Sequence, residues 1–246
     1  LPAISATRFR AAGQVIRPKG EVRGRVALLS GCIMPLVNGP EMNAVVRILS
    51  RNGVEVVVPK NQGCCGAINS HVGDLDMTRE LARRNTDAFL ADQVDAIVVA
   101  SAGCGVRMKE YDHLLADDSE YRDRAIQVSA MVKDIHEYLV ELPFEPPSGD
   151  LNLRVTYQDP CHLANAQRIT AAPRQILQSI PGLELVELSN ASVCCGAGGT
   201  YTITEHKFSL RVLDSKMKAV KTTEADIVAT ANPGCLLQLK LGAKRE

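Results

Sequence analysis

Short apolar runs alternate with longer segments of helical periodicity along this chain. The runs at residues 25–30, 54–58 and 96–100 are rich in Val, Ile, Leu and Ala, which predicts three buried strands. Between them, residues 41–52 and 75–91 carry apolar side chains three and four positions apart, which predicts two amphipathic helices. Strands that alternate with helices are typical of a parallel sheet with helices on its faces.

The second half of the chain repeats this order. It predicts strands at residues 154–157, 183–188 and 226–230 and helices at residues 173–179, 205–220 and 236–242. Between the halves, residues 130–142 are predicted as a polar helical stretch. We therefore expect an α/β fold of two tandem, duplicated Rossmann-like domains, each with a small, mostly parallel sheet flanked by helices. Their expected bounds are residues 25–142 and 151–246, with a weakly patterned lead-in at residues 1–24 and a Pro/Gly/Ser-rich linker at residues 143–150.

The composition excludes some classes of function. Apolar residues make up 46% of the chain, and Lys+Arg and Asp+Glu both number 28, so the net charge is zero. This balance gives no support to nucleic-acid binding or to a polybasic membrane anchor. The longest apolar runs, such as residues 96–102, are too short to span a bilayer. The chain starts at Leu1 without a signal-peptide pattern, so we expect a fragment or processed chain that works in the cytoplasm, with peripheral association at the inner membrane face.

All eight cysteines fall into two quartets with matching spacing. The first quartet is Cys32, Cys64, Cys65 and Cys104, and the second is Cys161, Cys194, Cys195 and Cys235. Matching members are offset by 129, 130, 130 and 131 residues. Random placement would not produce such similar offsets, so the pattern indicates a duplicated module with a soft-metal or redox site in each copy.

Two simpler interpretations of the cysteines stand beside this one. Four structural disulfides are typical of small secreted proteins, but this chain has enough apolar residues for a core, and adjacent cysteines bridge poorly to each other. Cysteine is also often buried as a small apolar residue for packing alone. The repeated spacing favours a binding site over both.

Each quartet is distributed over the ends of three predicted strands. One cysteine follows the first strand, a pair follows the second, and one follows the third. The carboxyl ends of parallel strands meet at one edge of a sheet, where α/β proteins bind their ligands, so each quartet is expected to converge there. Gly63 and Gly66 allow a turn that brings neighbouring sulfurs inward, and the glycine-rich residues 197–199 expose backbone amides that can donate to sulfur.

Four thiolates around one centre suit either zinc or an iron–sulfur cluster. Structural zinc sites usually contain short C-x2-4-C knuckles, and ferredoxins contain a C-x2-C-x2-C run. Neither spacing is present here. The spacing therefore predicts a soft-metal site and leaves the metal open.

The cysteine motifs resemble the duplicated cysteine-rich CCG domains of heterodisulfide reductase, of lactate-utilisation iron–sulfur proteins and of the iron–sulfur subunit of glycolate oxidase. The last of these is the most similar, and the resemblance extends from about residue 25 onward. It is carried by residues 62–67 (QGCCGA), 101–105 (SAGCG), 108–111 (MKEY), 159–162 (DPCH), 194–201 (CCGAGGTY) and 230–235 (TANPGC).

The resemblance implies an electron-transfer subunit that is not catalytic alone. A flavoprotein partner would oxidise a 2-hydroxy acid such as glycolate, and electrons would pass through 4Fe-4S-type centres held by the eight cysteines toward a quinone-linked or membrane acceptor. It also implies an upstream module with ferredoxin-type cysteine runs. The motif of the reductase ends in Cys-x-x-Cys, whereas residues 104–108 read CGVRM and residues 235–238 read CLLQ.

Two other functions remain as alternatives. One is a structural or assembly module with zinc at one or both sites. The other is a heterodisulfide reductase-like subunit that acts on a disulfide or quinone, which the missing last cysteines disfavour.

Other polar residues close to the cysteines have both functional and structural interpretations. His162 and His71 suit a fifth ligand or a proton relay, or a hydrogen-bonded structural role. Asp159 is expected to orient the loop that follows it. Arg107 and Lys109 either offset thiolate charge or lie on a solvated helix face.

Overall fold

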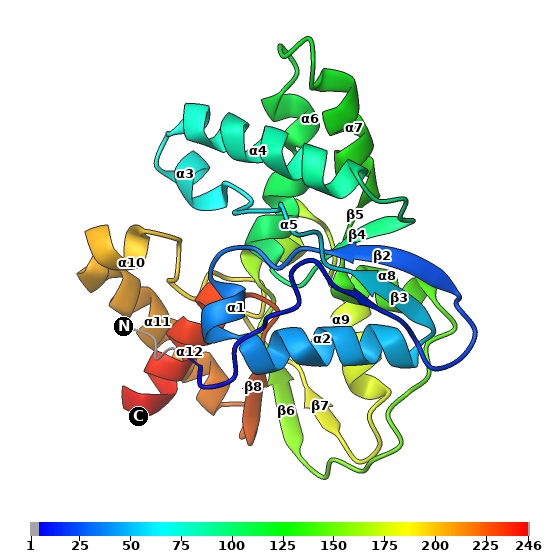
Figure 1. Ribbon diagram of the computed structural model, residues 1–246. Helices are drawn as coiled ribbons and strands as arrows, with labels where there is room; N and C mark the ends of the chain where they lie inside the picture. Colours follow the sequence, from blue (N-terminus) through cyan, green and yellow to red (C-terminus); the bar gives the residue numbers. More distant parts are fainter. Residues whose placement is uncertain (1–4, 246) are drawn as a thin grey trace. The chain divides into compact units, whose positions relative to one another are not determined.

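The computed structural model describes residues 5–245, and it divides into two compact units (Figure 1). The first unit extends to Glu145 and the second begins at Pro146. Each unit contains its own sheet, so the expected pair of α/β domains with mostly parallel sheets is confirmed.

The first unit is built around a five-stranded sheet with the order β1-β3-β2-β4-β5. Its strands are β1 (Val15–Ile16), β2 (Gly24–Leu28), β3 (Val54–Val57), β4 (Ala96–Val99) and β5 (Val132–Asp134). Strands β2 to β5 are parallel where they pair, and β1 is antiparallel to β3. The central three strands are the predicted apolar runs, and β4 is buried on both faces.

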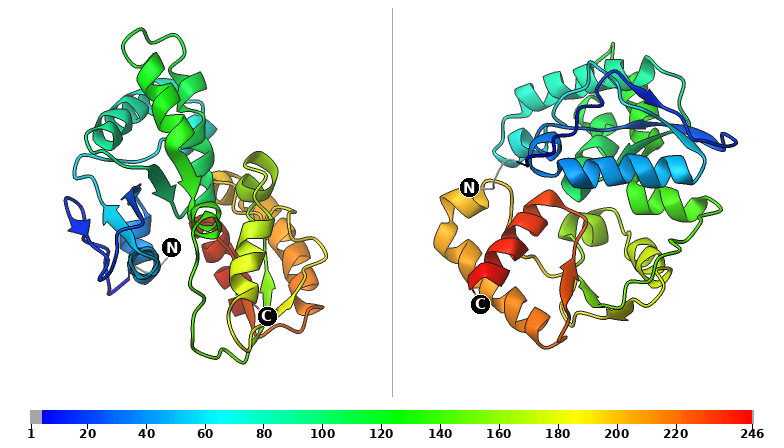
Figure 2. Two further views of the ribbon diagram at one scale, coloured as in Figure 1. Left: turned by 90° about the vertical axis from the view of Figure 1, so that its right-hand side faces the viewer. Right: turned by 60° about the horizontal axis from the view of Figure 1, so that its bottom comes forward.

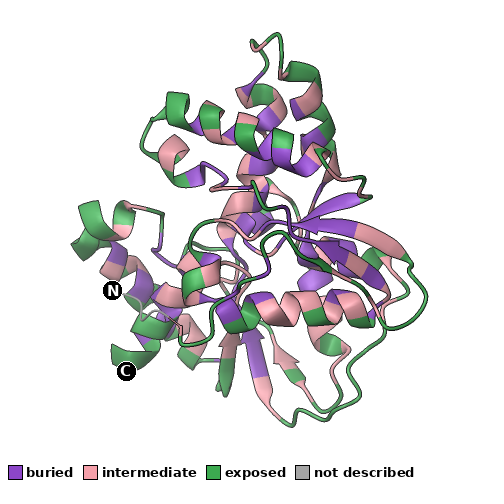
Figure 3. Cartoon of the chain, in the orientation of Figure 1, coloured by how far each residue is buried: buried purple, intermediate pink, exposed green. Residues whose placement is uncertain are grey.

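Eight helices surround this sheet within the described residues. They are α1 (Met34–Val37), α2 (Gly39–Arg51), α3 (Ala67–His71), α4 (Leu75–Leu90), α5 (Ala102–Lys109), α6 (Tyr111–Leu114), α7 (Arg122–Met131) and α8 (Ile135–Glu141). The predicted helices at residues 41–52 and 75–91 are α2 and α4. The Asp74 side chain caps α4 by accepting a hydrogen bond from the backbone amide of Met77 at 3.2 Å. The inward faces of the helices are buried (Figure 3).

Two segments of the first unit differ from the sequence prediction. Residues 130–142 are not one helix, because β5 separates α7 from α8 and pairs with β4. Asp134 ends this strand and caps α8 with a capping box, which restarts the helix. Within the expected lead-in, β1 adds an edge strand to the sheet, and Phe9 and Ala11 are buried.

The second unit contains a three-stranded parallel sheet with the order β7-β6-β8. Its strands are β6 (Arg154–Tyr157), β7 (Glu184–Val186) and β8 (Ile227–Ala229), at the three predicted positions. Its helices are the π-helix η1 (His162–Ala166), α9 (Ala171–Gln178), α10 (Tyr201–Thr204), α11 (His206–Lys221) and α12 (Pro233–Arg245). The strands with α9, α11 and α12 can be followed in Figure 2. The sequence pattern did not predict η1 or α10.

Among the described residues, none of the helices in either unit combines the length and the apolar character needed to cross a membrane.

The N-terminal segment of the first unit packs closely on the start of α2, and this contact yields a stability prediction. A Cβ at Gly39 would overlap the carbonyl oxygen of Thr7, while the backbone amides of Ser5 and Phe9 bond the carbonyl oxygens of Leu36 and Pro35. We expect Gly39→Ala to lower the free energy of unfolding by about 1–3 kcal/mol, because this backbone must shift. Denaturant unfolding measures the loss.

Gly20→Ala is the matched control for this substitution. A Cβ at Gly20 meets no atom within 4 Å, so its effect is expected to stay within about 0.5 kcal/mol. Equal midpoints for wild type and Gly39→Ala would contradict the close packing of this segment.

Candidate functional site

The first cysteine quartet gathers at the carboxyl edge of the first sheet. Cys32 follows β2, the Cys64–Cys65 pair follows β3, and Cys104 lies in the first turns of α5, after β4. Strands β3, β2 and β4 are parallel neighbours, so their carboxyl ends lie side by side. The thiols form a continuous hydrogen-bonded series from Cys32 through the pair to Cys104.

The second quartet has the same arrangement in the second unit. Cys161 follows β6, the Cys194–Cys195 pair follows β7, and Cys235 lies at the start of α12, after β8. Hydrogen bonds join Cys161 to Cys194, Cys194 to Cys195, and Cys195 to Cys235. All eight cysteines are free thiols. The structure therefore brings together the members of each predicted quartet within its own unit.

The pKa directions alternate along each series of thiols. The hydrogen bond to Cys64 raises the pKa of Cys32, and bonds to Cys104 and Cys64 raise the pKa of Cys65. The same bonds lower the pKa values of Cys64 and Cys104, which accept them. In the second quartet the pKa is raised at Cys161 and Cys195 and lowered at Cys194 and Cys235, for the same reason. In each quartet two sulfurs therefore act as hydrogen-bond donors and two as acceptors.

The glycine after each cysteine pair is required by the backbone. Gly66 has φ +83° and Gly196 has φ +91°, in the left-handed region that favours glycine. A Cβ at Gly66 would lie 3.0 Å from the Thr78 side chain, and a Cβ at Gly196 would lie 2.5 Å from the Ser209 carbonyl oxygen. Glycine therefore allows each dicysteine loop to lie directly against the helix that follows it.

Polar groups donate hydrogen bonds to the sulfur atoms. The backbone amide of Gly196 donates to Cys194 Sγ at 3.3 Å, and Asn232 Nδ2 donates to Cys235 Sγ at 3.6 Å. A hydrogen bond from Ser101 helps to lower the pKa of Cys104. Donors of this kind stabilise thiolates and the sulfur ligands of metal centres.

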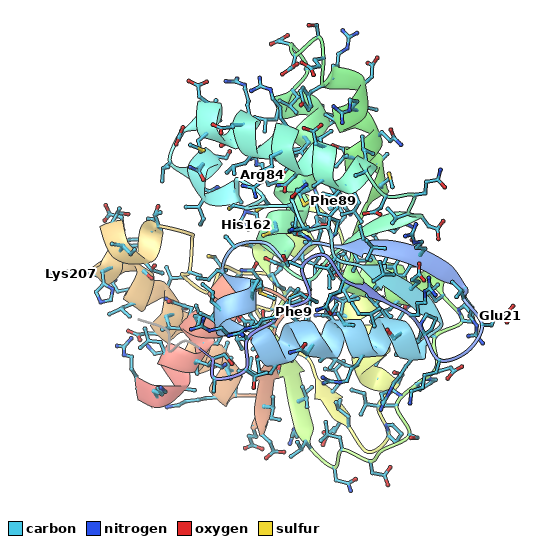
Figure 4. All side chains as sticks on the ribbon, in the orientation of Figure 1. Phe9, Glu21, Arg84, Phe89, His162 and Lys207 are labelled. Atoms are coloured by element: carbon cyan, nitrogen blue, oxygen red, sulfur yellow. The ribbon has the colours of Figure 1, made fainter. Side chains whose placement is uncertain are left out.

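Buried polar side chains that the sequence pattern did not reveal hold the first dicysteine loop. Asn85 on α4 accepts a hydrogen bond from the Gly63 amide at 2.8 Å and donates to the Cys64 carbonyl oxygen at 2.8 Å. The Tyr111 hydroxyl donates to the Cys65 carbonyl oxygen at 2.9 Å and accepts from Asn85 at 3.0 Å. Arg84, labelled in Figure 4, donates to the carbonyl oxygen of Asn61 at 2.8 Å. A polar residue on the apolar face of a predicted helix is the signal that would have identified Asn85.

Different side chains, equally unmarked in the sequence pattern, hold the second loop. Ser209 on α11 donates to the Gly196 carbonyl oxygen at 2.8 Å and accepts from Gln238 at 3.0 Å. The ammonium group of Lys216, also on α11, donates to the backbone carbonyl oxygens of Asn190 and Ala191. The two loops are thus held by chemically different partners.

The other candidate polar residues are placed as follows. Asp159 forms a two-pronged ion pair with Arg174, at 2.9 Å for each oxygen, directly before the Cys161 loop. Arg107 and Lys109 pair with the carboxylates of Glu110 and Glu137, at 3.2 and 2.8 Å. Carboxylates therefore neutralise the charges of Arg107 and Lys109, and neither cation needs a thiolate as its partner.

The two candidate histidines lie in short helices close to the cysteines. His162 opens η1 next to Cys161, and His71 ends α3, the helix after the first pair. The hydrogen bond to Cys194 raises the pKa of Cys161, and the backbone amide of His162, which donates to this sulfur, offsets part of that rise. The roles expected of the two imidazole rings stay predictions.

The four thiols of each quartet are suitable ligands for a soft metal, although their sulfur atoms are arranged as thiols that hydrogen-bond to one another. Within residues 5–245, no group of three or more His, Cys, Asp or Glu side chains has the spacing of a ready-made metal site. Hydrogen-bonded thiols form an open series, whereas metal ligands surround a point. Four thiols with amide donors nevertheless match the ligand chemistry of iron–sulfur clusters and of zinc.

Comparisons with known proteins agree with this duplication. The family model for the CCG cysteine-rich domain matches residues 26–109 and again residues 155–240. The probable glycolate oxidase iron-sulfur subunit of Bacillus subtilis (strain 168) is 47% identical over 231 residues, which cover 92% of this chain and 52% of that protein. The glycolate oxidase iron-sulfur subunit of Escherichia coli (strain K12) is 32% identical over 226 residues, covering 91% of this chain and 55% of that protein.

A third relative is matched over nearly its whole length. Lactate utilization protein A of Geobacillus kaustophilus (strain HTA426) is 33% identical over 216 residues, covering 87% of this chain and 90% of that protein. This chain therefore spans about half the length of the glycolate oxidase subunits and most of a lactate utilization protein.

The hydrogen bonds around Tyr111 predict a stability effect at the first site. Tyr111→Phe leaves the buried Cys65 carbonyl oxygen and one Asn85 N–H without their partner. We expect a loss of about 1–3 kcal/mol in the free energy of unfolding, because buried unsatisfied groups carry their full desolvation cost. Thermal or denaturant unfolding measures it.

Tyr121→Phe serves as the control, since that hydroxyl bonds Asp87 at the surface and is expected to contribute less than about 1 kcal/mol. If the two variants lost the same stability, the Tyr111 hydroxyl would not be a support of the dicysteine loop.

Proposed function

The chain belongs to the CCG cysteine-rich domain family, of which it contains two copies, and on that premise we propose that it is the iron–sulfur, electron-transfer part of an oxidoreductase complex. The observation that carries this proposal is the convergence of four thiols at the carboxyl edge of each sheet. The names of its glycolate oxidase relatives support the same class of function.

Each quartet is proposed to hold one centre of the 4Fe-4S type. Cys32, Cys64, Cys65 and Cys104 would hold the first, and Cys161, Cys194, Cys195 and Cys235 the second. Thiolates are the ligands that iron–sulfur clusters use, and the amide of Gly196 and the side chain of Asn232 donate to the second set. Bound clusters would supply one-electron redox chemistry, while the chain provides ligands, burial and hydrogen bonds.

The exposure of the cysteines supports electron transfer to and from a partner. Cys32 and Cys194 are exposed, whereas Cys65, Cys195 and Cys235 are buried. Each centre would thus be reached from the solvent side through one cysteine while its other ligands stay shielded. We propose that a flavoprotein subunit oxidises a 2-hydroxy acid such as glycolate and delivers electrons here, and that they continue to a quinone-linked acceptor at the inner membrane face.

Direct disulfide chemistry is the weaker candidate function. Arg107 and Gln238 stand three residues after Cys104 and Cys235, where the reductase motif ends in a further cysteine. Arg107 pairs with Glu110 and Gln238 donates to Ser209, so both positions serve the packing of the loops. Four sulfurs per site suffice to hold a cluster but leave no additional thiol for exchange with a disulfide.

Metal and sulfide analysis after anaerobic reconstitution tests the proposed function. Wild type is expected to bind iron and acid-labile sulfide and to absorb broadly in the visible range, because thiolates ligate both centres. Cys65→Ala and Cys195→Ala are each expected to lose about half of the iron, and the double variant nearly all of it.

The two single variants control for each other, since each removes one buried ligand from one unit. A colourless wild-type protein that contains zinc and no sulfide would reject the electron-transfer function in favour of a structural zinc module.

A further inference from the structure

The helix behind each dicysteine loop places one buried side chain at the same position in both units. Gly66 packs against Thr78 on α4, and Gly196 packs against Ser209 on α11. Asn85 lies seven residues after Thr78, and Lys216 lies seven residues after Ser209, which is about two helical turns in each case. Asn85 is 0% exposed and Lys216 is 1% exposed. The two side chains are therefore equivalent by position and differ in charge.

The first site is supported by neutral groups. Asn85 bonds the Gly63 amide and the Cys64 carbonyl oxygen, and the groups that shift the pKa values of Cys32, Cys64 and Cys104 are other cysteines, backbone amides and Ser101. Arg84, next to Asn85, bonds the carbonyl oxygens of Asn61 and Gln62 but is exposed, so solvent and salt screen its charge.

The second site has a buried cation instead. The Lys216 ammonium donates to the carbonyl oxygen of Asn190, to the side-chain oxygen of Asn190 at 3.3 Å, and to the carbonyl oxygen of Ala191 at 3.4 Å. These residues lie in the loop between β7 and Cys194. A buried ammonium group is expensive unless nearby negative charge compensates it.

The second sulfur quartet lies within electrostatic reach of this ammonium group. In the described part of the chain, no carboxylate pairs with Lys216 within ion-pair distance, and the carboxylate of Asp159 is already held by Arg174. Burial lowers the pKa of Lys216, while Cys195, Cys194 and Cys235 are the largest influences in the opposite direction.

We propose that Lys216 is the counter-cation of the second sulfur site, where it stabilises the negative four-thiolate centre and gives it a higher reduction potential than the first site. A centre held by four thiolates carries net negative charge, and reduction adds one electron without making or breaking a bond. A buried positive charge stabilises the reduced state more than the oxidised state. Electrons that enter the chain would therefore reduce the second centre in preference to the first. The statement about potential rests on the proposed iron–sulfur function, whereas the counter-cation role does not.

A redox titration compares the two sites directly. The second centre is studied alone in a Cys65→Ala background, and the first alone in a Cys195→Ala background. In the former, Lys216→Met is expected to lower the reduced fraction at a given potential about tenfold, which is about 59 mV for a one-electron couple. Lys216→Arg is expected to stay close to wild type, because it keeps the charge.

Lys218→Met is the matched control, since Lys218 lies on the same helix but outside the buried face, and it is expected to leave the potential unchanged. An unchanged potential in Lys216→Met, an equal drop in Lys218→Met, or a first centre with the higher potential would each overturn the proposal. So would an equal drop in Lys216→Arg, since the effect would then come from packing and not from charge.

Cobalt binding by the metal-free Cys65→Ala protein tests the counter-cation without any cluster. Binding of Co²⁺ releases the thiol protons to solvent and leaves a four-thiolate complex of net negative charge, so Lys216→Met is expected to weaken the affinity about tenfold and Lys218→Met to leave it unchanged. Thiolate-to-cobalt absorption reports the binding. Weakened cobalt binding in a protein that assembles no cluster would uphold the counter-cation and reject the iron–sulfur function. If the protein assembles clusters but Lys216→Met changes neither the reduction potential nor the cobalt affinity, the counter-cation role is rejected and the iron–sulfur function stands.

Discussion

The shared edge of three parallel strands is the constraint on which both sites depend. Cys32, Cys64 and Cys104 are separated by more than 30 residues in sequence, yet they follow strands that are neighbours in the order β3-β2-β4. Hydrogen bonding between parallel strands fixes their carboxyl ends at one edge, and the sulfur atoms meet there. The second unit achieves the same result with only three strands, so the minimum needed for the site is the central strand with one parallel neighbour on each side.

That geometry requires side chains that hydrogen-bond to the backbone of the cysteine loops. A loop that turns two adjacent sulfurs toward one point leaves backbone amides and carbonyl groups buried without strand partners, and these groups need other partners. Asn85 and Tyr111 provide them in the first unit, and Ser209, Gln238 and Lys216 in the second. The side chains that hold the two loops differ in charge, although the loops follow the equivalent strands β3 and β7 and each packs on the next long helix. Duplication has thus kept the position of the ligands and allowed their electrostatic surroundings to diverge.

The sequence predicted the central strands and the quartets because both are written in local patterns, namely β-branched runs and cysteine spacing. It missed β5, where Val132 and Asp134 face inward around the less buried Lys133, because three residues are too few to show a strand period. It missed β1, because two residues show no strand pattern of their own and form a strand only by pairing with β3. It also missed Asn85 and Lys216, because polar residues on helices are usually at the surface and only the neighbouring loop explains their burial.

Protection of the cysteines against alkylation tests the convergence of each quartet most directly. The reconstituted chain is treated with iodoacetamide before and after the metal is chelated, and each cysteine is located by peptide mapping. If each quartet surrounds one centre, Cys32, Cys64, Cys65 and Cys104 are protected together and become reactive together on chelation, and the second quartet behaves in the same way. Alkylation of some members of a quartet while the others stay protected in the loaded protein would contradict this account.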